Sequence, residues 1–93
     1  MIQSFRHKGL QQFFETGSKA GIQAAHANRL QRQLFTLNRA LSPQDMNVHG
    51  WRLHPLTGAG EPLHWSILVN CNWRITFAFQ GEDAILVNYQ DYH

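Results

Sequence analysis

Two histidines, His54 and His93, and one arginine, Arg74, are of types that together suit the cleavage of RNA. A 2′-hydroxyl can attack the adjacent phosphate if a base takes its proton, an acid protonates the 5′-oxygen and a cation neutralises the phosphate. Histidine side chains titrate near neutrality, and each acid or base contributes about 10² to 10⁴ in rate. Because a guanidinium binds phosphate in bidentate geometry, the three residues predict a phosphate-cleaving site that needs no metal.

Each of these residues also has a simpler interpretation. A single surface histidine is more often solvated or a helix cap than catalytic, and Arg74 is equally well explained by pairing with an Asp or Glu on a neighbouring strand. Arg52 is a second cation close to His54 in the sequence, and Tyr92 can stack on an unpaired base. Trp51 has the same capacity, although core packing explains it better.

Metal-dependent hydrolysis is the weaker alternative. The sequence has no His-Glu-x-x-His segment and no carboxylate cluster, and its single cysteine, Cys71, excludes an internal disulfide or a multi-thiolate zinc site. A chain of 93 residues buries only a modest core, so we expect one domain over residues 1–93, with a surface site and no cofactor. No apolar run is long enough to span a bilayer and the first residues lack a signal-peptide core, which predicts a cytoplasmic protein without membrane partners.

Charge is distributed unevenly along the chain. Residues 1–41 hold six lysines and arginines against one glutamate, whereas residues 42–93 hold two arginines against five acids, together with four of the six histidines. A basic half favours a surface that faces phosphate, but a solvated helix face explains the same charges equally well.

The first half of the sequence predicts two helices that would support this site. The first has apolar residues at helical spacing from Leu10 to Phe14, and Gly17 suits the left-handed residue that ends a helix. The second carries a stripe of leucines, Leu30, Leu34, Leu37 and Leu41. Ser42-Pro43 is expected to end this helix, and a short alternating segment at Ile2 suggests an edge strand.

From residue 51 the apolar period changes to two, which predicts an antiparallel meander. Strands are expected over Leu63–Asn70, over Trp73–Phe79 and around Ile85–Tyr89. The order of elements predicts an α+β fold in which two N-terminal helices pack on one face of a small antiparallel sheet and leave the other face free. Since the odd positions of the middle strand are apolar, Arg74 should point to the free face, where ligand chemistry is expected. The segments Ser42–Trp51 and Leu56–Pro62 are expected to be flexible.

Four segments make the sequence similar to a known family: Met1–Phe5, Arg52–Leu56, Asn72–Phe77 and Asn88–His93. Their His-Pro-Leu, Trp-Arg-Ile and Asp-Tyr-His blocks span nearly the whole chain and resemble those of HigB-type toxins of the RelE superfamily. The resemblance implies a RelE-like fold and a ribosome-dependent, metal-independent endoribonuclease that cleaves translated mRNA and so inhibits translation. It further implies neutralisation by a HigA-type antitoxin, with the pair binding operator DNA.

The same resemblance assigns roles to residues. His54 and His93 would be acid-base or phosphate-contacting groups, and Arg74 would be the phosphate clamp. Tyr92 would stack on a base or orient a neighbour, and Asp91, which the chemistry alone did not indicate, would orient a histidine. Which histidine acts as the base stays open.

One position departs from the family pattern. Close relatives often carry a lysine after His-Pro-Leu, whereas Thr57 stands here. The loss of this cation beside the phosphate is expected either to lower the catalytic activity or to leave the contact with the phosphate to Arg52.

Two other function classes compete with the ribonuclease. A non-catalytic binding module on the same fold, either a ParE-like gyrase inhibitor or a weakened toxin acting as co-repressor, predicts dispensable histidines. A structural RNA-binding protein that uses the basic half predicts salt-dependent affinity without cleavage.

Overall fold

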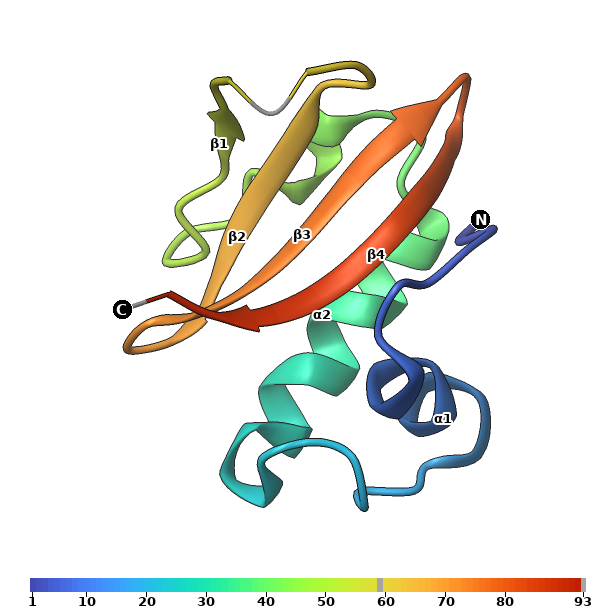
Figure 1. The fold of residues 1–93 in the computed structure, drawn as a ribbon, viewed down its shortest axis with the longest axis vertical. Helices are drawn as coiled ribbons and strands as arrows, with labels where there is room; N and C mark the ends of the chain where they lie inside the picture. Colours follow the sequence, from blue (N-terminus) through green and yellow to red (C-terminus); the bar gives the residue numbers. More distant parts are fainter. Residues whose placement is uncertain (59, 93) are drawn as a thin grey trace.

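Four antiparallel strands form a sheet in the order β1-β2-β3-β4, with the longer helix behind it and the shorter helix below its lower end (Figure 1). This computed structural model describes residues 1–58 and 60–92. The strands are β1 (His54–Leu56), β2 (His64–Asn70), β3 (Trp73–Gln80) and β4 (Asp83–Asp91). The helices are α1 (Lys8–Thr16) and α2 (Ala27–Arg39), with 3₁₀ turns at Ala24–His26 and Pro43–Met46.

Helix α1 begins and ends where its sequence provides caps. The Nδ1 atom of His7 accepts a hydrogen bond from the Leu10 N–H at 2.9 Å, which satisfies one of the free amides of the first turn. At the other end Gly17 adopts a left-handed conformation, with φ of 81°, and its N–H donates to the Phe13 carbonyl. The predicted stop at this glycine is confirmed.

Helix α2 buries its leucine stripe against the sheet. Leu30, Leu34 and Leu37 are at most 1% exposed and belong to the same core cluster as the inward residues of β2, β3 and β4. The prediction that Leu41 is the fourth member of the stripe was wrong. The helix ends at Arg39, Ala40 adopts an extended conformation, and Leu41 is 58% exposed. The period of the leucines continues past the point at which the backbone leaves the helix.

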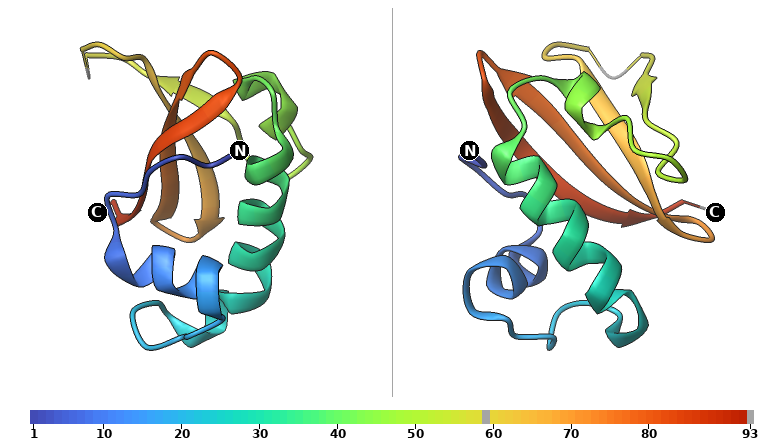
Figure 2. Two further views of the ribbon diagram at one scale, coloured as in Figure 1. Left: turned by 90° about the vertical axis from the view of Figure 1, so that its right-hand side faces the viewer. Right: turned by 180° about the vertical axis from the view of Figure 1, so that it is seen from behind.

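The two layers agree with the predicted α+β architecture. Seen from behind, α2 runs across the back of the sheet, and α1 lies beside its lower part (Figure 2). Strand β1 was not predicted, since three residues are too few to show a period. The segment expected to be flexible between the helices and the sheet contributes two buried side chains to the core, Met46 and Trp51. None of the helices in the described part of the chain combines the length and the apolar character needed to cross a bilayer.

The N-terminal segment runs parallel to β4 and pairs with it through two isolated bridges, Ile2 with Ala84 and Phe5 with Val87. The edge strand suggested at Ile2 is therefore reduced to these bridges. Opposite this segment β4 carries a bulge, in which Leu86 takes a left-handed φ of 56° and its N–H donates to the Ser4 hydroxyl. Bulges re-aim side chains next to functional sites, and this one turns Leu86 into a groove on the front of the sheet.

Candidate active site

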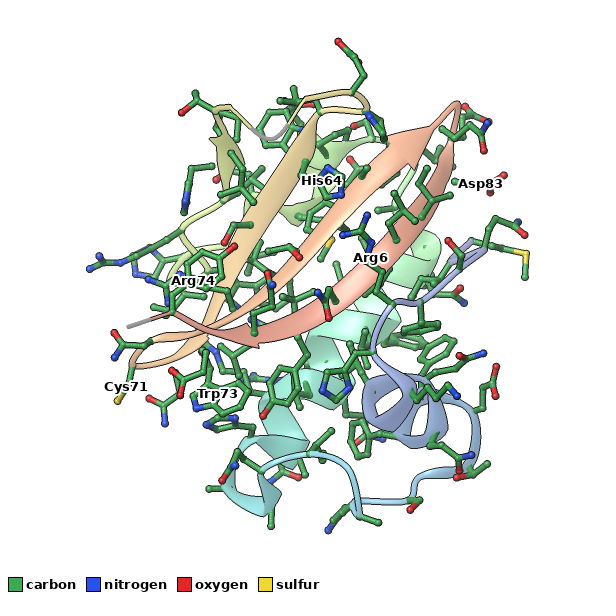
Figure 3. The ribbon with its side chains drawn as sticks, viewed as in Figure 1. Arg6, His64, Cys71, Trp73, Arg74 and Asp83 are labelled. Carbon is green, nitrogen blue, oxygen red and sulfur yellow. The ribbon has the colours of Figure 1, made fainter. Side chains whose placement is uncertain are left out.

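The register of the strands places His54 at one end of a row of polar side chains. His54 pairs with Ser66, Ser66 with Thr76, and Thr76 with Asn88, so all four side chains share one face of the sheet. Arg74 belongs to the next row on the same face, between Leu68 and Gln90. Because Ile75 and Phe77, which alternate with this face, pack in the core with the leucines of α2, the predicted orientation of Arg74 away from the core is confirmed (Figure 3).

A groove of about 260 Å³ runs over this face of the sheet. Its lining residues come from the N-terminal segment, all four strands, the β1–β2 connection and the residue after β4: Arg6, Leu56, Glu61, Pro62, His64, Thr76, Leu86, Asn88, Gln90 and Tyr92. The face is less open than expected, because Ser66 and Ala78 are 0% exposed and Thr76 is 4% exposed although α2 lies on the other side of the sheet. These small residues form a floor that the longer side chains around them shield from solvent.

His54 is held in one tautomer by the chain that precedes it. Its Nδ1 atom lies 3.0 Å from the carbonyl oxygen of Arg52. Since a carbonyl oxygen only accepts, Nδ1 must carry the proton, and in the neutral ring Nε2 is the atom with a free lone pair. Arg52 itself has a left-handed φ of 53°, a conformation that costs a non-glycine residue roughly 1–2 kcal/mol and occurs preferentially at functional sites. The backbone of Arg52 therefore fixes the orientation of His54.

Arg74 uses one nitrogen of its guanidinium for the protein and leaves the other two available. Its Nη1 donates to the carbonyls of Cys71 at 3.0 Å and of Trp73 at 3.2 Å. Within residues 1–58 and 60–92, Nε and Nη2 have no hydrogen-bond partner, and the one ion pair joins the Met1 amino group to Asp83. Pairing of Arg74 with a neighbouring acid, the simpler interpretation of this residue, is not found there. The Nε–Nη2 edge has the geometry that a phosphate accepts.

Tyr92 is anchored at the end of the groove nearest Arg74. Its backbone N–H donates to the Asn72 carbonyl at 2.8 Å, and its hydroxyl donates to Oε1 of Gln90 at 3.2 Å. Gln90 is the residue that pairs with Arg74 across the β3–β4 ladder. The ring is 40% exposed, so a base can stack on it.

Asp91 and His93 are the two remaining residues of the predicted site. Asp91 pairs with Trp73, and its position alternates with those of Gln90 and Tyr92, which places it on the Trp73 side of the strand. His93 lies outside the described residues. The roles of Asp91 and His93 therefore stay predictions.

His64 and Arg6 are two of the groove residues to which the sequence pattern assigned no role. The signal for His64 was present, since it alternates with Trp65, Ile67 and Val69 in a strand whose odd positions are apolar. No local signal marks Arg6, because its place depends on the pairing of the N-terminal segment with β4. Of the other cations in the basic half, Arg29 is used structurally and donates to the carbonyls of Leu68 and Gly50.

A second pair of titratable groups lies behind the sheet, in the core. Tyr89 Oη is 2.6 Å from Nδ1 of His26 and accepts a hydrogen bond from the Gln23 N–H at 3.3 Å. Burial lowers the pKa of His26. Burial also raises the pKa of Tyr89, and the nearby charge of Asp91 adds to that shift. Both groups are thus held neutral, and we assign them to stability because the sheet separates them from the groove.

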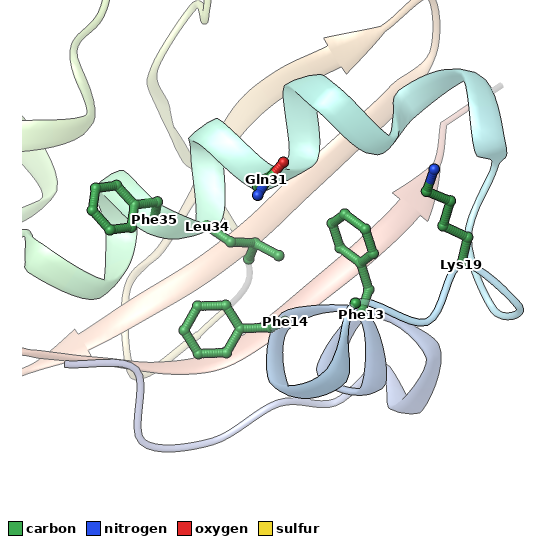
Figure 4. A pocket seen from close by; sticks show the side chains of 7 residues that line it. Phe13, Phe14, Lys19, Gln31, Leu34 and Phe35 are labelled. Atoms are coloured by element: carbon green, nitrogen blue, oxygen red, sulfur yellow. The ribbon is translucent and has the colours of Figure 1, made fainter.

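A larger depression, of about 400 Å³, lies between the two helices (Figure 4). Phe13, Phe14, Leu34 and Phe35 supply most of its wall, with Lys19 and Gln31 beside them. Among the described residues, no histidine, aspartate or glutamate lines it, so they offer no acid-base pair there. Nowhere in the described part of the chain do three His, Cys, Asp or Glu side chains cluster as metal ligands would.

Comparison with known proteins assigns the family. A family model described as the RelE-like toxin of the type II toxin-antitoxin system HigB matches residues 3–93. The chain belongs to the HigB-like toxin family. Endoribonuclease HigB of Proteus vulgaris is 44% identical to it over 93 residues, which is 100% of both chains. The resemblance found in the sequence blocks is confirmed, and membership of a type II toxin-antitoxin family implies an antitoxin as partner of this HigB-like toxin.

Proposed function

We propose that this HigB-like toxin is an endoribonuclease that cleaves mRNA on the ribosome without a metal ion. The observation that carries the proposal is the open Nε–Nη2 edge of Arg74 on the same sheet face as His54. The name of the Proteus vulgaris relative supports the same activity. The groove, at about 260 Å³, is smaller than most pockets for small molecules, which suits a strand laid across a surface.

The chemistry follows from His54 and Arg74, which share the groove's face of the sheet but do not themselves line the groove. The 2′-oxygen forms a bond to phosphorus as a base removes its proton, and the bond from phosphorus to the 5′-oxygen breaks as an acid protonates that oxygen. The products are a 2′,3′-cyclic phosphate and a 5′-hydroxyl. Nε2 of His54 has the free lone pair that a base needs, and the same atom serves as the acid if it starts protonated. The complementary role falls to His93.

Arg74 and Tyr92 position the RNA for this reaction. The Nε–Nη2 edge of Arg74 binds the phosphate and stabilises the negative charge that develops on it. Strands β1 and β3 are separated by β2, and Arg74 lies one row of side chains away from His54, so their backbones are roughly 12 Å apart, a gap that a nucleotide can bridge. Tyr92 stacks on a neighbouring base, and Arg52 adds a second cation near the phosphate.

In vitro translation with programmed ribosomes tests this function directly. Purified toxin is added to ribosomes on a defined mRNA, and the 5′ ends of the fragments are mapped. We expect cuts within the translated codons, none in the same mRNA without ribosomes, and a loss of at least 10²-fold in rate for His54→Ala. His49→Ala is the matched control, because His49 is an exposed turn residue outside the strands that carry the proposed site. Cleavage by His54→Ala at the wild-type rate would contradict the proposal, as would growth arrest accompanied by DNA damage with intact mRNA.

We further propose that a HigA-type antitoxin neutralises the toxin and that the pair binds operator DNA. Co-expression with the antitoxin should restore growth, and the gel shift of operator DNA should require the antitoxin. A toxin that arrests growth equally in the presence of folded antitoxin would refute this pairing.

A further inference from the structure

Two buried polar atoms on the groove side of β2 have no hydrogen-bond partner. They are Nε2 of His64 and Oγ of Ser66, and the third such atom in the described residues, Oε1 of Gln33, belongs to α2. His64 and Ser66 are alternate residues of one strand, so both side chains lie on the groove face. An unpartnered buried polar atom destabilises the free protein, and a ligand that supplies the missing hydrogen bond recovers that loss.

The ring of His64 is fixed in the same tautomer as that of His54. Its Nδ1 lies 2.9 Å from the carbonyl oxygen of Pro62, which only accepts, so Nδ1 carries the proton. In the neutral ring Nε2 is therefore an acceptor, and it can accept a hydrogen bond from a donor such as a hydroxyl. The β1–β2 connection thus prepares a hydrogen-bond acceptor inside the groove.

Arg6 brings a positive charge to the same part of the groove. Its side chain and that of His64 line one depression, and Figure 3 shows both on the front of the sheet. The backbone of Arg6 is tied down, because its N–H donates to the Val87 carbonyl at 2.8 Å. Glu61 also lines the depression, so a phosphate is expected on the Arg6 side and away from this carboxylate.

The position of His64 separates it from the cleavage chemistry. His64 pairs with Leu56 and Ala78 in the row on one side of the row of His54. Arg74 lies in the row on the other side of the row of His54. Rows on one face are two residues apart, which is about 7 Å along a strand. A nucleotide held at His64 is therefore a neighbour of the one that is cleaved.

We propose that His64 and Arg6 form a second nucleotide subsite in the groove. Nε2 of His64 accepts a hydrogen bond from a ribose 2′-hydroxyl, and Arg6 neutralises the phosphate of that nucleotide. The subsite rests on the proposed ribonuclease function and adds selection for RNA, because the 2′-hydroxyl is the group that distinguishes RNA from DNA. His64 acts here in binding and takes no part in proton transfer.

A scan of 2′-deoxy substitutions in the mRNA tests the subsite. Each nucleotide flanking the cut is replaced singly by its deoxy form, and kcat and KM are measured on programmed ribosomes for the wild type, His64→Phe, His64→Gln and the control His49→Phe. For the wild type, one flanking position should raise KM about 3- to 10-fold, the value of one hydrogen bond. His64→Phe should raise KM for all-ribose mRNA by the same factor with little change in kcat, and should abolish the deoxy effect. His64→Gln, which keeps an acceptor, should restore part of it.

Arg6 is tested through its charge. Arg6→Gln should raise KM and reduce the slope of log affinity against log salt by about one contact. If Arg6→Gln shows the same salt slope as the wild type, Arg6 does not contact a phosphate in the subsite.

Three results would overturn the subsite: a deoxy effect that persists in His64→Phe, a loss of kcat at unchanged KM, or an equal change in His49→Phe. If His64→Phe fails to fold, judged by its thermal unfolding, the comparison of His64→Gln with the wild type decides the matter. If the wild type cleaves no RNA, the proposed function fails and the subsite is tested separately, by fluorescence anisotropy of a labelled RNA oligonucleotide and its deoxy counterparts. A His64-dependent deoxy effect there supports the subsite, and its absence overturns it.

Discussion

Replacement of Arg74 by lysine keeps the positive charge but removes the planar guanidinium edge that can bind two phosphate oxygens. The guanidinium has five N–H donors, and the two on Nη1 hold the carbonyls of Cys71 and Trp73. The remaining three lie on Nε and Nη2 and present a flat edge to a phosphate. A lysine ammonium has three donors on one atom, so it cannot hold both carbonyls and also bind two phosphate oxygens.

The size of the effect follows from the hydrogen bonds that are lost. A hydrogen bond to a charged group contributes about 1.5–3 kcal/mol, so Arg74→Lys, which loses one phosphate contact, should slow cleavage about 10- to 150-fold. Arg74→Gln loses the charge and both contacts, and should slow it more than about 10³-fold. The free energy of unfolding should fall by less than about 1 kcal/mol in Arg74→Lys, since the bonds that it loses in the free protein are to exposed or half-buried carbonyls.

Single-turnover cleavage of mRNA on programmed ribosomes measures these rates, and urea unfolding of the same preparations shows whether the variants are folded. Wild-type cleavage by a folded Arg74→Lys variant would refute the bidentate contact. Wild-type cleavage by Arg74→Gln would remove Arg74 from the site altogether.

Three further predictions concern the fold that carries the site. Burial lowers the pKa of His7 and of His26 in the folded protein. Between the folded and the unfolded pKa values, the unfolded chain therefore binds more protons than the folded protein. The free energy of unfolding should be at its full value above about pH 6.5 and should fall as the pH drops below it. Urea unfolding from pH 7.5 to 5.5 checks this, and an unchanged slope in the double variant His7→Asn, His26→Asn would contradict it. Tyr89→Phe should lower the free energy of unfolding by about 1–3 kcal/mol, because it leaves buried polar groups without their partner, and equal denaturation midpoints would argue against that contact. Gly9→Ala should destabilise by about 1–3 kcal/mol despite the better helix propensity of alanine, since the new Cβ would lie 2.5 Å from the Gly21 carbonyl oxygen; a rise in Tm would show that the two backbones separate freely.

The local pattern of the sequence determined the elements and which way their side chains face. Apolar spacing located both helices and three strands, Gly17 marked the end of α1, and alternation in β3 turned Arg74 away from the core. These features depend on residues a few positions apart, where the period of the backbone acts directly on burial. Leu41 shows the limit of such reasoning, since its period fits a helix that the backbone has already left.

Pairing between distant segments was decided only by the tertiary structure. The place of Arg6 in the groove depends on an N-terminal segment that pairs with β4 more than 80 residues later, and β1 is too short to show a period of its own. The sequence supplied a cation at Arg74, but only the packed sheet shows that no acid within the described residues pairs with it. Local periodicity determines the face of an element on which a side chain lies. The partners of that side chain are determined by contacts between segments far apart along the chain, and such contacts do not affect the spacing of apolar residues within one segment.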